Sequence, residues 1–511
     1  MGAQQSKPSP EAAKAVMHEK AVIDRIMNLD VQDAGDDFVH VSSEKGSFLR
    51  HKIARLPEKI VLELTQNWQS KLLADPKNRL ALSALSAANP RDVLTSRSVK
   101  IADQQVFNIR IPFEGAPITN QRSSGRCWLF ASTNVFRVAI MKKYNLDAFE
   151  LSQAYLFYWD KLEKSNFFLE NIIDTADQPL DDRLVQRLLA EPISDGGQWD
   201  MVYNLVEKYG LVPQALYPDS WNAMSSSTIN YIVVAKLREY AVTLRKLVNS
   251  PKTTVSSLAA IKGKMLREIH LILTLTLGPP PSTTEEFEWE FLDKDGKAVT
   301  VVSTPHQFAK DLASPEFRIT SSAIASMVSL VHDPRHEPLT LMTVDRLGNI
   351  VGGRGITYIN VDINTLKQAC VAMLKAGLPI FFGSDVGKFS ERNSGIMDLD
   401  IIDYEVGFNV NLYGSLDKAA RLRVGESSMT HAMVLTAVHV DEDGKPVRWR
   451  VQNSWGTANG DKGWFVMSDR WLDEFVFQAV VDPRFLSKRV RDVLSQEPIV
   501  LPLWDPMGSL A

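Results

Sequence analysis

Cysteine is scarce in this chain of 511 residues, which contains only Cys127 and Cys370. A secreted protein of this length normally carries several disulfides, so the scarcity favours a reducing compartment. Two cysteines are also too few for a cysteine-rich zinc site. We therefore expect no metal and no other cofactor.

Long apolar runs and several catalytic motifs are lacking as well. No run approaches eighteen apolar residues, so no transmembrane helix is expected, and the N-terminus has no hydrophobic signal-peptide core. The chain has no His-Glu-x-x-His, Gly-x-Ser-x-Gly, Walker or Gly-x-Gly-x-x-Gly motif. These absences argue against metallopeptidases, α/β-hydrolases and nucleotide-binding enzymes.

The composition is that of an ordinary globular protein, with 23% charged residues, 45% hydrophobic residues and a formal net charge of -4. The mild acidity gives no global reason to expect a nucleic-acid partner. The N-terminus, with Gly2 after Met1 and with Ser6, matches the short N-myristoylation pattern, and the alternative is a flexible polar start. A single acyl chain would give only weak membrane association.

The patterning predicts an α+β protein with a helix-rich first half and a β-rich second half. Cys127 to Tyr144 contains no Gly or Pro and is expected to form a buried central helix, whereas residues 430–440, 447–452 and 463–467 are expected to form strands. Residues 228–277 have helical spacing and stop at Gly278-Pro-Pro-Pro281. We expect an N-terminal extension over 1–58, a helical half over 59–225, a large helical insertion over 226–335, a β-rich half over 336–497 and a C-terminal arm over 498–511.

Cys127 is the candidate nucleophile. It follows the polar stretch Ser123-Ser-Gly-Arg126 at the start of the predicted central helix. The helix dipole and the unpaired N–H groups of the first turn favour a thiolate there. The alternative, a buried structural cysteine, fits Cys370 in its apolar helical stretch better than it fits Cys127.

A thiolate nucleophile also needs a proton carrier, which we assign to His431. His439 lies on the same face of the same predicted strand, eight residues on (439 minus 431). Eight residues of strand span about 26 Å, so the two histidines cannot serve one nucleophile. His431 begins the strand, where it can reach a cleft, whereas His439 precedes a turn and is interpreted as structural or superficial.

Two further residues complete the predicted site. Asn453 lies 22 residues after His431 (453 minus 431), at the end of the next strand, and could orient the imidazole. The alternative is an ordinary loop with a buried Trp455; otherwise Trp455 could cover the Asn–His hydrogen bond. Gln121, six residues before Cys127, offers an amide donor for an oxyanion.

These motifs carry a family resemblance. Gln121-Arg-Ser-Ser-Gly-Arg-Cys127-Trp128 resembles the corresponding stretch of papain-like cysteine peptidases and, within them, the bleomycin hydrolase family, whose fungal members the C-terminal tail resembles most closely. Further stretches resemble that family: Met429-Thr-His431, Gln452-Asn453-Ser-Trp-Gly, Asp195-Gly-Gly-Gln198, Asp333-Pro-Arg-His336 and Leu501-Pro-Leu-Trp-Asp-Pro-Met-Gly508. Cys127 and His431 are 304 residues apart (431 minus 127), against about 130–150 in typical papain-like enzymes, and the helical insertion accounts for the surplus.

The resemblance implies a papain-like fold and a cytoplasmic homohexameric aminopeptidase that removes N-terminal residues from peptides. It also implies hydrolysis of the bleomycin amide and of homocysteine thiolactone, and a mitochondrial form can accompany the cytoplasmic one. It implies substrate binding by Asp195, Gly196 and Gly197, and a C-terminal arm in the cleft whose Ala511 carboxylate attracts a free α-amino group.

The sequence leaves two rival functions open. The first is a nucleic-acid-binding hexamer on the same fold with peptidase activity secondary or lost, since fungal members of the family also bind DNA. Against a dead site, Gln121, Cys127, His431 and Asn453 are all present. The second is an endopeptidase of cathepsin type, against which the missing signal peptide and the scarce cysteines argue.

Overall fold

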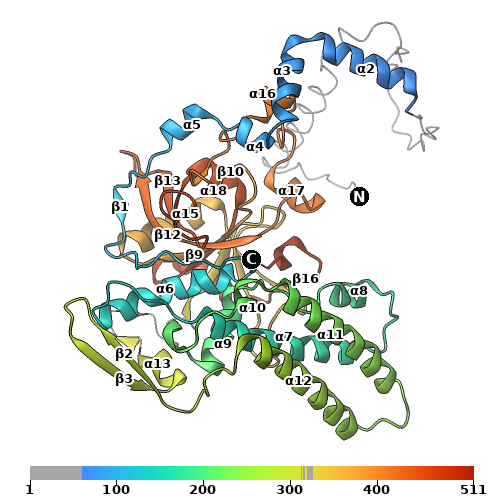
Figure 1. Ribbon diagram of the computed structural model, residues 1–511, viewed down its shortest axis with the longest axis vertical. Helices are drawn as coiled ribbons and strands as arrows, with labels where there is room; N and C mark the ends of the chain where they lie inside the picture. Colours follow the sequence, from blue (N-terminus) through green and yellow to red (C-terminus); the bar gives the residue numbers. More distant parts are fainter. Residues whose placement is uncertain (1–59, 312, 315–316, 319–325, 511) are drawn as a thin grey trace, which may run out of the picture. The chain divides into compact units, whose positions relative to one another are not determined.

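The computed structural model describes residues 60–311, 313–314, 317–318 and 326–510 (Figure 1). The myristoylation prediction at Gly2 and the carboxylate predicted at Ala511 lie outside the described residues. No described helix is both long and apolar enough to cross a membrane.

The chain divides into two compact units, Met1–Asn89 with Gly407–Ser415, and Pro90–Val406 with Leu416–Ala511. The first boundary therefore falls at residue 89, not at residue 58 as expected. In the first unit, α2 (Leu62–Ala74) and α3 (Pro76–Leu85) meet at Asp75, whose side chain accepts from Lys77 N–H and caps α3. Neither of these two helices buries a residue.

The second unit is built on a mixed sheet, for which the described residues give 12 strands in the order β10-β11-β14-β13-β12-β9-β15-β6-β8-β7-β16, with β1 beside β12. The strands are β1 (Ile109–Arg110), β6 (Val328–Val331), β7 (Thr340–Val344), β8 (Tyr358–Asn360), β9 (Ile380–Ser384), β10 (Ser390–Glu391), β11 (Ile396–Met397), β12 (His431–Val440), β13 (Pro446–Gln452), β14 (Trp464–Ser468), β15 (Val476–Val481) and β16 (Ile499–Leu501). Strand β1 has only two residues, and it pairs antiparallel with β12. The three predicted C-terminal strands correspond to β12, β13 and β14.

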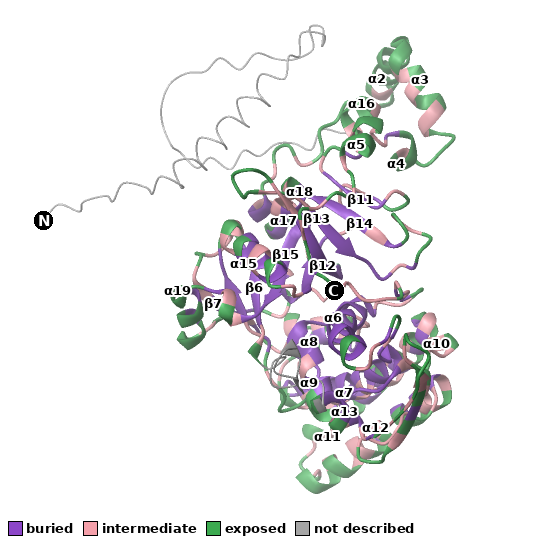
Figure 2. Ribbon diagram, turned by 90° about the vertical axis from the view of Figure 1, so that its left-hand side faces the viewer, coloured by how far each residue is buried: buried purple, intermediate pink, exposed green. Residues whose placement is uncertain are grey.

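The central helix is α6 (Cys127–Lys143), which contacts β12 and β9 on one side and the helices α7 and α9 on the other. Of its 17 residues, only the last two are not buried, because the helix lies between sheet and helices (Figure 2). The surrounding helices of this half are α7 (Gln153–Asp174), α8 (Arg183–Ala190), α9 (Trp199–Tyr209) and α10 (Trp221–Met224). The α+β, papain-like fold class expected from the sequence is confirmed.

The predicted insertion is helical only in its first half. Helices α11 (Ser227–Val248) and α12 (Val255–Leu277) pack on each other and on α7. Beyond Gly278 the chain forms a hairpin, β2 (Phe287–Leu292) with β3 (Ala298–Ser303), then α13 (Pro305–Asp311). Strand β6 belongs to the main sheet, so describing 226–335 as helical throughout was wrong. The error arises because alternating Phe287, Trp289 and Phe291 form one aromatic face that packs on Tyr144 and Phe149.

The C-terminal arm adds a strand to the sheet, since β16 pairs parallel with β7 from Ile499–Met342 to Leu501–Val344. The remaining described elements are α4 (Pro90–Val93), α5 (Arg97–Ala102), η1 (Gln214–Leu216), β4 (Ala313–Ser314), β5 (Phe317–Arg318), α15 (Ile363–Lys375), α16 (Tyr404–Phe408), α17 (Lys418–Val424), α18 (Asp469–Phe475), η2 (Pro483–Phe485), α19 (Lys488–Arg491), η3 (Asp492–Ser495) and η4 (Pro506–Gly508).

Candidate active site

Cys127 is the first residue of α6, and its side chain is only 2% exposed. The preceding Arg126 is fully buried, and its guanidinium donates two hydrogen bonds to the Asp219 carboxylate, at 2.7 and 3.0 Å. A bidentate Arg–carboxylate pair fixes orientation as well as charge. The pair therefore holds the backbone at the position from which the cysteine side chain projects.

His431 begins β12, and its ring nitrogen Nε2 lies 2.9 Å from Asn453 Oδ1. The same oxygen accepts from the Ser454 backbone N–H at 2.7 Å, and because an N–H only donates, this atom is the amide oxygen. His431 must therefore carry its proton on Nε2, leaving Nδ1 for proton exchange with a thiol. The β12–β13 register pairs Val434 with Gln452, which is why the two side chains meet despite the intervening turn.

Trp455 stacks on the His431 ring with a centroid separation of 4.8 Å and an interplanar angle of 29°. The indole thereby shields the imidazole, which belongs to a residue that is 4% exposed. The Arg392 guanidinium lies over the Trp455 ring, 4.8 Å from the ring centroid. The predicted cover of the Asn–His hydrogen bond is thus present as an aromatic stack.

Gln121 is anchored from both ends of its amide. Its Nε2 donates to the Ser124 carbonyl at 2.7 Å, and its Oε1 accepts from the Ser454 hydroxyl at 2.7 Å. An amide nitrogen carries two hydrogens, so a second N–H is available beyond the bond to Ser124. Gln121 lines the same cavity as Cys127 and His431, which is where an oxyanion donor is required.

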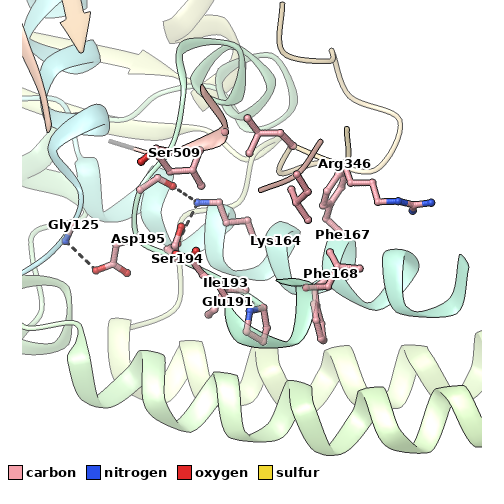
Figure 3. Close-up of a pocket in the computed structure, with 18 of the residues that line it drawn as sticks. Gly125, Lys164, Phe167, Phe168, Glu191, Ile193, Ser194, Asp195, Arg346 and Ser509 are labelled. Carbon is pink, nitrogen blue, oxygen red and sulfur yellow. Dashed lines mark hydrogen bonds between the residues drawn. The ribbon is translucent and has the colours of Figure 1, made fainter. Parts of the chain in front are cut away.

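The Asp195 side chain binds other groups of the protein. Its carboxylate accepts from the Gly125 N–H at 3.0 Å, lies 2.6 Å from Lys161 Nζ and also accepts from Ser226. Its carbonyl accepts from the Trp128 indole N–H at 2.6 Å. Asp195 therefore ties the loop before Cys127 to helices α7 and α11, and this carboxylate is committed to protein partners. Figure 3 shows its hydrogen bond from Gly125.

Gly196 and Gly197 follow Asp195 and differ in position. Gly196 lines the cavity, and its carbonyl accepts from Lys164 Nζ at 2.6 Å. A Cβ on Gly197 would lie 2.5 Å from the Trp128 ring, so this glycine allows the chain to pass over the indole. Substrate contact by these three residues stays a prediction, with Gly196 and Asp195 the two that line the cavity.

Burial opposes charge on each catalytic group taken singly. It raises the pKa of the Cys127 thiol to about 11, although backbone N–H groups of Ala432 and Trp128 pull it down. It lowers the pKa of His431 to about 4, against the Asn453 hydrogen bond, which raises it. A thiolate and an imidazolium must therefore appear together by proton transfer, and they titrate as a pair. The N-terminus of α6 favours the thiolate side of that pair.

The cavity at Cys127 has a volume of about 420 Å³. Near the thiol it is lined by Gln121, Gly125, Thr430 and His431, and its other walls come from α7, α8, the 191–196 segment, the 346–348 turn and the C-terminal arm. Figure 3 shows Lys164 and Ser509 on one side of this space and Phe167, Phe168 and Arg346 on another. The space is thus closed by residues from both halves of the fold and from the chain's own end.

The arm reaches the cavity with Gly508, Ser509 and Leu510, which all line it. The Ser509 carbonyl accepts from Gln198 Nε2 at 2.9 Å, and its hydroxyl donates to the Met429 carbonyl at 2.7 Å. Gln198 is the N-cap of α9 and Met429 precedes His431, so Ser509 is bonded to both halves of the fold.

Several residues of the site were not found from the sequence. Lys161 and Lys164 are buried on α7, where both donate to the Ser194 carbonyl and Lys164 also pairs with Asp160. The signal was available, because charged residues at i, i+1 and i+4 in an otherwise apolar helix imply buried partners. His439 pairs with Arg448 at the far end of β12, and Cys370 is fully buried in α15. Neither of these two residues lines the cavity.

The described part of the chain contains no group of three or more His, Cys, Asp or Glu residues suited to a metal ion. Cys127 and His431 line one cavity, and a thiol beside an imidazole can perform nucleophilic attack with the imidazole as proton carrier.

Comparisons with known proteins agree with this geometry. The model of the "Peptidase C1-like family" matches residues 59–508. Cysteine proteinase 1, mitochondrial, of Saccharomyces cerevisiae is 42% identical over 467 residues, which cover 90% of this chain and 94% of the yeast protein. Human bleomycin hydrolase is 43% identical over 448 residues, covering 86% of this chain and 96% of the human protein.

A solved structure is also similar. The crystal structure of PepW from Lactobacillus rhamnosis HN001 superposes with a TM-score of 0.83 at 41% sequence identity, covering 89% of this chain and 100% of PepW. The cysteine, histidine and asparagine geometry, the family match and these near full-length similarities lead to one conclusion. The chain belongs to the peptidase C1-like family and, within it, to the cysteine peptidases of bleomycin hydrolase type.

Proposed function

We propose that this cysteine peptidase is an aminopeptidase that removes residues from the N-termini of peptides. One observation carries the proposal: Ser509 and Leu510 of the C-terminal arm line the same cavity as Cys127 and His431. A chain end in this position leaves little room for substrate on that side of the nucleophile. Its carboxylate, on Ala511, would then attract the free α-amino group of the substrate.

The reaction begins when the Cys127 thiol passes its proton to His431 Nδ1 and the thiolate attacks the scissile carbonyl carbon. The negative charge moves to the carbonyl oxygen, where the Gln121 amide and the first N–H groups of α6 stabilise it. The imidazolium then protonates the leaving amine as the C–N bond breaks, giving a thioester on Cys127. A water molecule, deprotonated by His431, attacks the thioester and releases the amino acid.

The same chemistry extends to other acyl substrates. Relatives named bleomycin hydrolase are similar over 86% of this chain, so we include the bleomycin amide among the substrates. Homocysteine thiolactone carries a free amine beside an activated acyl–sulfur bond, and it fits the same constellation. We place the enzyme in the cytoplasm because its cysteines are scarce, and a second, mitochondrial form remains part of the proposal given the name of the yeast relative.

We further propose a homohexamer. The first unit presents apolar side chains to solvent on α2 and α3, among them Trp68, which is 50% exposed, and Leu80, which is 72% exposed. Apolar helical surface of this kind favours association with another protein surface. Light scattering of the purified chain measures the assembly, and a monomer at micromolar concentration would contradict the proposal.

The decisive experiment compares hydrolysis of aminoacyl fluorogenic amides with a free and with an acetylated amine. We expect the wild type to cleave only the free-amine substrate. Deletion of residues 509–511 should weaken that cleavage and admit the acetylated substrate. Retention of the preference after deletion would show that the arm is not the determinant.

Two cysteine variants test the chemistry itself. Cys127→Ala should abolish hydrolysis of both substrates, and Cys370→Ala, the matched control in the core, should retain it. Activity in Cys127→Ala would exclude the thiol mechanism.

A further inference from the structure

The C-terminal arm is held near its end by an ion cluster. The Arg335 guanidinium donates to both oxygens of the Asp505 carboxylate, through NH1 at 3.1 Å and NH2 at 2.7 Å. Arg335 lies in the loop between β6 and β7, and Asp505 lies six residues before the end of the chain (511 minus 505). The bidentate geometry fixes both distance and direction between the loop and the arm.

Arg335 is oriented independently of the arm. Its Nε donates to Asp333 Oδ1 at 2.9 Å and its NH2 to Asp333 Oδ2 at 2.8 Å. Asp333 is fully buried, and its backbone N–H donates to Asn360 Oδ1 at 2.9 Å. The Asp333 carboxylate therefore fixes the orientation of the guanidinium, whose NH1 and NH2 groups face Asp505.

The segment from Asp505 to Ser509 is compact and transmits this constraint. Asp505 Oδ1 accepts from the Met507 N–H at 2.8 Å, the Asp505 carbonyl accepts from the Gly508 N–H at 2.8 Å, and the Ser509 N–H donates to Pro506 at 3.1 Å. One 3-10 turn, η4, thus joins the clamped residue to the residues lining the cavity. Tyr358 adds a hydrogen bond from its hydroxyl to the Met507 carbonyl at 3.3 Å.

We propose that Arg335 is a specificity-determining positioning residue that, through its bidentate pair with Asp505, sets how far the arm extends into the cavity of Cys127. The inference rests on the proposed aminopeptidase function and names the part of the protein that fixes its register. Strand β16 tethers the start of the arm, but residues 502, 503 and 504 lie between Leu501 and Asp505 outside the strand, and the sheet does not restrict their backbone freedom. The Arg335–Asp505 pair removes that freedom at the last turn before the site.

The test uses the full-length protein with Asp505→Asn as its main variant. Asparagine keeps the side-chain oxygen that caps η4, and Arg335 keeps Asp333, so no buried charge is left alone. Arg335→Lys is the second variant, since lysine keeps the charge but cannot form the fork. Asp400→Asn is the matched control, because it removes the charged partner of Arg470, at 2.8 Å, from an exposed pair outside the arm.

Two quantities are measured for each variant. The first is the ratio of kcat/KM for the free-amine and acetylated amides. The second is the rate of hydrogen exchange at the backbone amides of residues 508 and 509. This rate rises when the arm loosens, even if the rest of the fold is unchanged. For Asp505→Asn we expect the ratio to fall and the exchange to accelerate, each about 10-fold, with a smaller change for Arg335→Lys and none for Asp400→Asn.

The outcomes separate this inference from the proposed function. If deletion of residues 509–511 changes the ratio and Asp505→Asn does not, the arm determines specificity but Arg335 does not position it. If neither the deletion of residues 509–511 nor Asp505→Asn changes the ratio, the proposed function itself fails. Faster exchange with an unchanged ratio in Asp505→Asn also overturns the inference, because the arm would then be loosened without consequence for the substrate.

Discussion

The Gly125 N–H donates to Asp195 Oδ2 at 3.0 Å, which joins the loop before the nucleophile to a segment 70 residues further along the chain (195 minus 125). A Cβ on Gly125 would lie 2.7 Å from the Asp195 Cβ, so the two backbones approach as closely as a glycine permits. The carboxylate also pairs with Lys161, which is 1% exposed in its side chain. Asp195 is therefore a brace for the start of α6 and for the cavity wall.

Asp195→Asn should destabilise the protein strongly. Lys161 would keep its place in the interior without its charge partner, and removal of one member of a buried pair typically costs about 3–5 kcal/mol of the free energy of unfolding. Urea denaturation followed by tryptophan fluorescence measures the difference. A change within 1 kcal/mol, estimated as about the size of an exposed pair, would contradict the buried-brace interpretation.

The pH dependence of stability gives this variant a second test. Burial raises the pKa of Asp195, but the charge of Lys161 and hydrogen bonds from Ser226 and Gly125 outweigh it and hold the pKa below its usual range. The carboxylate therefore stabilises the fold above its unfolded pKa of about 3.9, and that contribution is lost as the pH falls towards the folded value. The difference in stability between wild type and Asp195→Asn should therefore begin to shrink as the pH falls below about 4, which is roughly the pKa of an aspartate in the unfolded chain.

Gly197→Ala should impair both folding and activity. The new methyl would lie 2.5–2.6 Å from three atoms of the Trp128 ring, and displacement of that indole would move the residue next to Cys127. Overpacking of this kind costs about 1–3 kcal/mol or more. Gly355→Ala is the matched control, because a Cβ there meets nothing within 4 Å. Equal melting temperatures for the two variants would show that the chain at Gly197 has room to shift.

Gln121→Ala should lower kcat by about 10²–10³-fold with little change in KM, because an oxyanion donor acts on the transition state. Ser454→Ala removes only the hydroxyl that anchors Gln121 Oε1 at 2.7 Å, and should lower kcat by less than about 10-fold. Steady-state kinetics on a free-amine amide measures both. Wild-type kcat in Gln121→Ala would remove the oxyanion role from this side chain.

The chemistry of the site was accessible from the sequence, because it depends on local signals. A polar stretch before an apolar helix locates Cys127, and a strand that begins with histidine locates His431. The register of β12 and β13, which brings His431 and Asn453 together, could not be obtained from spacing alone, since hairpins with other registers place those strand ends apart.

The long-range braces were missed for a similar reason. Gly125 with Asp195, and Arg335 with Asp505, are separated by 70 and 170 residues, and nothing in the periodicity of either segment pairs them. The hairpin after Gly278 was missed although its signal was present, because Phe287, Trp289 and Phe291 alternate before a turn at Asp295-Gly296. Long, continuous apolar runs such as α6 and β12 could be predicted to within one or two residues, whereas partners chosen by tertiary packing could not.

His431 and Asn453 have different roles at the site, proton transfer and orientation of the ring, which their variants should separate. His431→Ala should lower kcat by about 10²–10⁴-fold, the range for a general acid–base group. Asn453→Ala should reduce it less, because Asn453 carries no proton and orients the ring through one hydrogen bond of 2.9 Å. His439→Ala is the matched control on the same strand, and it should leave kcat unchanged.

The pH profile distinguishes an orienting role from a purely structural one. Burial lowers the pKa of His431 to about 4, and the hydrogen bond to Asn453 acts in the opposite direction by favouring the imidazolium. Without that bond the imidazolium loses its proton more easily, so the alkaline limb of kcat/KM should move to lower pH in Asn453→Ala. A structural defect alone would reduce activity evenly across the pH range and leave the limb in place. If the limb moved to higher pH, or moved equally in His439→Ala, Asn453 would not be the residue that supports the charged form of His431.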